Sequence, residues 1–67
     1  MIRVYPSAPY HYEVTGANEK EAAAEFQTRL DRMERSWGYF QQSEESRIQD
    51  AADLRREIRE KYGVTIK

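Results

Sequence analysis

The residues best suited to chemistry in this chain are a histidine and a glutamate two positions apart, His11 and Glu13. On an extended strand their side chains would share one face, where they could form an acid–base pair or supply two ligands to a metal ion. A structural zinc ion needs four protein ligands and a catalytic one usually three, and the sequence offers no second histidine and no cysteine. We therefore expect a solvated strand face, with no metal and no cofactor.

The sequence also contains no nucleotide-binding or nucleophile motif. Its glycines, Gly16, Gly38 and Gly63, stand alone and do not form a phosphate-binding loop. Its serines have no neighbouring base that could activate a nucleophile. We expect that the protein is not an enzyme.

Arginines are the remaining residues with chemical meaning. They form two clusters: Arg29, Arg32 and Arg35, and then Arg55, Arg56 and Arg59. Together with tyrosines that stack bases, such clusters could bind nucleic acid. Interleaved acidic residues would repel phosphate, namely Glu25, Asp31, Glu34, Glu57 and Glu60. Nucleic-acid binding is therefore our second hypothesis and not our first.

Length and composition limit the chain to one small domain, residues 1–67, with a single thin core. Eleven basic residues against twelve acidic ones give a net charge of -1, which disfavours a function based on a one-signed surface. The chain contains no cysteine, no apolar run long enough to span a membrane and no signal-peptide pattern. We expect a cytoplasmic protein without membrane contact.

Alternating residues near the amino terminus predict two short strands, one around Ile2 and Val4 and one around Tyr10, Tyr12 and Val14. Two prolines in residues 6–9 favour a hairpin connection between the strands. Thr65 and its neighbours at the other end of the chain, residues 64–66, predict a third strand.

Two helices are expected between these strands. Asn18 and Glu21 resemble a capping box, so the first helix begins near Glu19. Its apolar stripe recurs every three or four residues: Ala23, Phe26, Leu30, Met33, Trp37 and Phe40. Gly38 interrupts the stripe, so the helix either stops at Trp37 or runs on to Gln42, and we favour the longer helix.

The second helix is predicted from Glu44 to Tyr62, with Ser43 as its N-cap and Gly63 as its left-handed C-terminal cap. Its apolar positions are Ile48, Ala51, Leu54, Ile58 and Tyr62. Each helix starts acidic and ends basic, which complements its dipole and favours antiparallel packing.

The predicted fold is α+β with the order ββααβ, an antiparallel helical hairpin packed on a small two- or three-stranded sheet. A long helical hairpin with frayed ends is the alternative. The apolar stripe can line an internal core, which we favour, or the seam of a homodimer. Monomer and homodimer both remain open.

In organisation, the whole chain from Met1 to Lys67 resembles the small phage-encoded anti-CRISPR proteins. The resemblance rests on size, the starting methionine, the motif-free ββααβ order and the preference for arginine, eight against three lysines. It implies a non-enzymatic protein that blocks a bacterial defence complex in the host cytoplasm by docking on one of its protein subunits. The near-neutral charge departs from the strongly acidic members, so the resemblance favours a block by shape over nucleic-acid mimicry.

The function we expect is that of a protein-binding module. Basic groups of the partner would meet four carboxylates: Glu44, Glu45, Asp50 and Asp53. Trp37 and Tyr39 would serve as apolar anchors, because exposed aromatic side chains often dominate binding energy. The expected partner is a protein subunit of a larger host complex.

Overall fold

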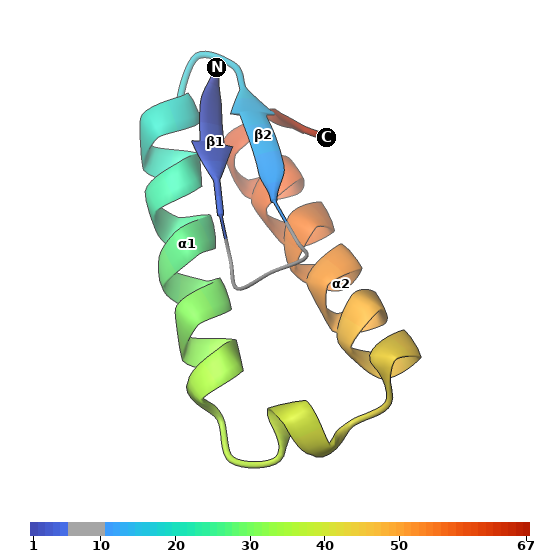
Figure 1. The fold of residues 1–67 in the computed structure, drawn as a ribbon. Helices are drawn as coiled ribbons and strands as arrows, with labels where there is room; N and C mark the ends of the chain where they lie inside the picture. Colours follow the sequence, from blue (N-terminus) through green and yellow to red (C-terminus); the bar gives the residue numbers. More distant parts are fainter. Residues whose placement is uncertain (6–10) are drawn as a thin grey trace.

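The structure, a computed structural model, describes residues 1–5 and 11–67 of the chain. Its secondary structure follows the predicted ββααβ order (Figure 1). The elements are β1 (Ile2–Val4), β2 (Tyr12–Thr15), α1 (Glu19–Arg35), a short 3-10 helix η1 (Tyr39–Gln41), α2 (Glu44–Tyr62) and β3 (Thr65–Ile66). The predicted connection at residues 6–9 and the predicted strand residue Tyr10 lie outside the described residues.

The three strands form one antiparallel sheet in the order β1-β2-β3. The pairing of Ile2 with Val14 and of Val14 with Ile66 places three apolar side chains in one row across the sheet. Beyond β3, the backbones of Glu13 and Lys67 exchange two hydrogen bonds of 3.0 Å. The prediction of an α+β fold is confirmed, with three strands in the sheet.

The core lies between this sheet and the two helices, which run in opposite directions (Figure 1). β1 and β2 contact α1, and β3 contacts α2. Val14, Phe26 and Ile58 are fully buried, and the rings of Tyr12 and Phe26 lie 5.4 Å apart between centroids. The first part of the predicted stripe therefore lies in an internal core, and a dimer seam along its whole length would have to unpack Phe26.

The caps of α2 are confirmed, whereas the capping box of α1 is wrong. The Ser43 side chain accepts a hydrogen bond from the Ser46 amide at 3.2 Å, and Gly63 adopts the left-handed conformation with φ 66°. Asn18 has φ -109° and ψ 31° and caps no amide with its side chain. Since an N-cap residue needs an extended backbone to aim its side chain at the first turn, Asn18 cannot fill this role.

This difference between the two helix starts predicts different costs of truncation. Ser43→Ala should lower the free energy of unfolding by roughly 0.5–2 kcal/mol, because the Ser46 amide loses its partner. Asn18→Ala should change it by less, since no side-chain cap bond is lost there. Urea denaturation followed by circular dichroism measures both values, and equal losses would contradict the assignment.

The first helix ends at Arg35, so the expectation that it continues to Gln42 is wrong. Ser36 is extended with ψ 132°, and Gly38 takes φ 92°. Because glycine reaches positive φ at no steric cost, the chain turns here rather than continue the helix. The predicted stripe is interrupted at the same point: Trp37 and Phe40 face solvent, and Tyr39 is buried instead.

The described strands cover only part of the helical hairpin. The molecule measures 36 by 17 by 16 Å, whereas a strand of four residues spans about 13 Å. The sheet lies over the start of α1 and the end of α2 (Figure 1). Toward the connection between the helices, α1 and α2 diverge and no described strand lies over them. We call this connection, residues 36–43, the tip.

Candidate functional site

The tip exposes the largest aromatic side chain of the protein. Trp37 is 90% exposed and Phe40 61% exposed. No residue of the tip carries a charge, although 34% of the whole chain is charged. Aromatic enrichment with charge depletion is the composition of the centre of a protein–protein interface. The tip is therefore the strongest candidate for a binding surface in the described part of the chain.

Several contacts order the backbone of the tip and the rings of Tyr39 and Phe40. The Tyr39 amide donates to the Ser36 carbonyl at 3.1 Å, and the Gln42 amide donates to the Tyr39 carbonyl at 3.2 Å. The buried Tyr39 ring meets the Phe40 ring edge to face, with centroids 5.0 Å apart. On α2, the Arg47 guanidinium lies 5.6 Å from the Phe40 centroid. A Phe40 ring that is already packed in this way loses little entropy on binding.

The structure separates the two predicted aromatic anchors. Trp37 is available to a partner, whereas Tyr39 is only 5% exposed and packs against the Phe40 ring. Phe40, which the stripe assigned to the core, is the exposed neighbour of Trp37. Ile48, one of the predicted apolar positions of α2, is 44% exposed. Gly38, where the chain turns after the end of α1, was the signal in the sequence that could have shown that Phe40 is exposed and Tyr39 buried.

The four predicted carboxylates do not form one surface. Since successive helix residues turn by about 100°, Asp50 and Asp53 lie about 240° and 180° around α2 from Glu44. Asp50 is half-buried, and Asp53 accepts hydrogen bonds from Gln49 at 3.0 Å and Arg56 at 3.5 Å. Glu44 and Glu45 are exposed beside the tip in the first turn of α2. Only this pair adjoins the aromatic side chains.

The arginine clusters are partly engaged in the fold. Arg29 forms ion pairs with Glu25 and Glu57, and Arg56 pairs with Asp53. Arg55 lies 4.5 Å from the centroid of the Tyr12 ring. Among the described residues, no hydrogen bond or ion pair engages three exposed members of the clusters, Arg32, Arg35 and Arg59. Two of these, Arg32 and Arg35, lie in the last turn of α1 next to the tip.

His11 and Glu13 have separate partners. The His11 ring stacks on Tyr5 with centroids 5.8 Å apart, and Glu13 accepts a hydrogen bond from Arg3 at 3.2 Å. Within residues 1–5 and 11–67, no three histidine, aspartate or glutamate side chains are grouped so that they could hold a metal ion. The described structure offers no further ligands around His11.

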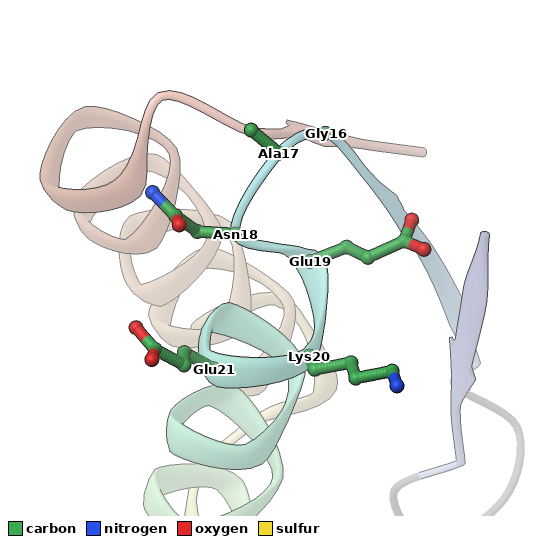
Figure 2. A pocket seen from close by; sticks show the side chains of 6 residues that line it. All are labelled: Gly16, Ala17, Asn18, Glu19, Lys20 and Glu21. Carbon is green, nitrogen blue, oxygen red and sulfur yellow. The ribbon is translucent and has the colours of Figure 1, made fainter.

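A shallow hollow at the start of α1 is lined by residues 16–21 (Figure 2). A helix start favours anions, but Glu19 and Glu21 already place two carboxylates there. Figure 2 shows the Glu19 side chain directed toward the strands, where it accepts a hydrogen bond of 3.1 Å from the amino group of Met1. These carboxylates disfavour a phosphate ligand, so we assign no function to the hollow.

A charged network joins the two helices far from the tip. Glu25 on α1 accepts hydrogen bonds from Lys61 at 2.7 Å and from the Tyr62 hydroxyl at 2.9 Å. These bonds, from Lys61 first and then from Tyr62, lower the pKa of Glu25 below its ordinary value of 4.5. The same contact with Glu25 raises the pKa of Lys61. The network stabilises the helix pair in its ionised form.

The lowered pKa of Glu25 predicts a specific acid sensitivity. A carboxyl group whose pKa is depressed by folding stabilises the protein above its unfolded-state pKa, and this stabilisation is lost as the pH falls through the folded-state pKa. Glu25→Gln should therefore be less stable than the wild type at neutral pH, and the difference should shrink below pH 4.5. Urea midpoints of the wild type and of Glu25→Gln, determined as a function of pH, measure this difference in stability. Glu60→Gln is the control, and a pH-independent difference for Glu25→Gln would contradict the prediction.

No protein-family model, curated protein or solved structure matches this chain. Neither α1 nor α2 of the described chain has an apolar stretch long enough to cross a bilayer. Within the described residues, the tip and the charges beside it are the features that bear most on function.

Proposed function

We propose that the protein is a non-enzymatic binding module that blocks a bacterial defence complex by docking its tip on one protein subunit of that complex. The observation that supports the proposal is the exposure of Trp37 beside Phe40. Tryptophan and other aromatic side chains dominate the binding energy of protein interfaces when they enter a dry pocket. A fold that leaves its one tryptophan in water gains nothing from it in stability.

The type of partner follows from the resemblance in size and organisation to the phage-encoded anti-CRISPR proteins. Such a small inhibitor works by occupying a surface that the larger complex needs. A tip whose Phe40 ring is already packed against Tyr39 and Arg47 suits this task, since less of its surface must be ordered on binding. The proposed location is the cytoplasm of the host cell.

The experiment is an affinity capture from nuclease-treated lysate of a bacterium that carries defence systems, followed by binding measurements with the purified captured subunit. Trp37→Ala should weaken binding at least 30-fold, which corresponds to about 2 kcal/mol for a hot spot. Tyr5→Ala, which removes a 60% exposed aromatic side chain directly after β1, is the matched control and should leave the affinity unchanged. Equal affinities for wild type and Trp37→Ala would refute a docking role of the tip.

A second candidate is nucleic-acid binding, favoured by one observation: Arg32 and Arg35 are exposed in the last turn of α1 next to the tip, and no ion pair within residues 1–5 and 11–67 engages them. Arginines could neutralise phosphates while the indole ring stacks on a base. Affinity for single-stranded DNA or RNA should then fall steeply with salt, and Arg32→Gln should reduce the slope by about one. Absence of binding at low salt with micromolar protein would eliminate this candidate.

A further inference from the structure

We propose that the partner receives the tip in an apolar cleft whose rim is acidic where it meets the end of α1 and basic where it meets the start of α2. This inference rests on the proposed function and specifies the partner's surface. It follows from the size of the exposed aromatic surface and from the distribution of charge around it.

The size of the aromatic surface argues for a concave partner. A tryptophan and a phenylalanine bury about 150–250 Å² each, so the exposed parts of Trp37 and Phe40 offer on the order of 300–400 Å². A stable interface needs about 800 Å² from each partner. The remainder must come from the sides of the tip, and only a cleft that surrounds the tip reaches them. Two copies of this protein meeting tip to tip would bury too little.

The exposed charges beside the tip are divided between its two sides. Arg32 and Arg35 lie in the last turn of α1, and Glu44 and Glu45 lie in the first turn of α2. All four are exposed, and no ion pair within the described residues engages them. Glu34 on α1 and Arg47 on α2 carry the opposite signs but are half-buried, and Arg47 lies over the Phe40 ring. A cleft with carboxylates on one rim and basic groups on the other complements this arrangement in one orientation only. The carboxylates of Glu44 and Glu45 would oppose insertion of Trp37 into an anionic membrane.

The cleft is tested by photo-crosslinking. A benzophenone amino acid replaces Trp37 in one variant and exposed Ala24, on the outer face of α1, in another. In nuclease-treated bacterial lysate, position 37 should crosslink to one protein, and the crosslinked peptide should line an apolar cleft of that protein. Excess unlabelled wild type should suppress this product at least tenfold, whereas excess Trp37→Ala should not, and position 24 should give no such product.

Other products at position 37 would overturn the inference and name the alternative. Crosslinks to a second copy of the chain would indicate a dimer, and crosslinks to lipid would indicate a membrane. In a parallel lysate without nuclease, crosslinks to nucleic acid would indicate the second candidate function. If position 24 crosslinks to one competed protein and position 37 does not, the protein-binding function stands and the cleft is wrong. If neither position crosslinks to a protein, both the function and the cleft are wrong.

Charge variants test the two rims once the subunit is captured. The double variants Arg32→Gln/Arg35→Gln and Glu44→Gln/Glu45→Gln should each weaken binding at least fivefold and lessen its salt dependence. Asp50→Asn/Asp53→Asn is the matched control, because these carboxylates point elsewhere on α2, and it should bind as the wild type does. An effect of the control as large as that of the Glu44/Glu45 variant would contradict the rim assignment.

Discussion

Replacing Phe26 by alanine should lower the free energy of unfolding by roughly 3–5 kcal/mol. The side chain is fully buried between the helices and the sheet, where its ring packs against Tyr12. A domain of this size has a total stability of about 3–10 kcal/mol, so the substitution removes a large share of it. Urea denaturation followed by circular dichroism measures the loss, and a midpoint at zero denaturant would mean that the variant is already half unfolded.

The matched control is Phe40→Ala, which removes the same side chain from the tip. Because Phe40 is mostly exposed, its loss should cost about 0.5 kcal/mol, within the range of surface substitutions. We expect a value at the upper end of the surface range because the Phe40 ring loses its contacts with Tyr39 and Arg47. If Phe40→Ala proved as destabilising as Phe26→Ala, the tip would be part of the core and its proposed role in binding would be wrong.

Gly16→Ala should destabilise the protein by roughly 2–4 kcal/mol, from backbone strain and overpacking together. Gly16 has φ 147°, a conformation that residues with a side chain rarely adopt. An added Cβ would also lie 3.0 Å from Cγ1 and 3.3 Å from Cα of Val64. The backbone of this buried valine enters β3, so it cannot move without disturbing the sheet. Thermal or urea unfolding measures the loss.

Gly38→Ala separates the two contributions. Gly38 also has a positive φ, 92°, but no atom lies within 4 Å of the position of its missing Cβ. This variant should lose only the conformational part, about 1–2 kcal/mol. Losses of similar size for Gly16→Ala and Gly38→Ala would show that the contact with Val64 is unimportant.

The sequence predicts most of this fold because local patterns and tertiary packing agree. Strands, helices and their order follow from alternation, from helical spacing up to Met33 and from the cap at Ser43, and the structure confirms them within the residues that it describes. The α2 boundaries are right at both ends, since a serine cap and a left-handed glycine mark them chemically. The capping box at Asn18 fails because its backbone is not extended, and backbone dihedrals cannot be read from residue types.

The candidate site was harder to predict, since one glycine decides it. With a continuous helix, Trp37 and Phe40 would point into the core; the turn at Gly38 exposes both and buries Tyr39. Glycine is only about 1 kcal/mol less favourable than alanine inside a helix, and this difference is too small to decide whether the helix ends at Gly38. The scattering of the four carboxylates around α2 could have been derived from the sequence, because it follows from helix geometry alone.

The central position of β2 joins segments that are far apart in the chain. Val14 pairs with Ile2 nearby in the chain and with Ile66 almost at its other end. The hairpin of β1 and β2 and the helical hairpin consist of local contacts that can form early, whereas β3 closes a loop of most of the chain. Until residues 64–67 have left the ribosome, one edge of β2 lacks its neighbour. A nascent chain paused before Val64 would therefore expose an unpaired strand edge, the kind of surface that chaperones and aggregating chains recognise.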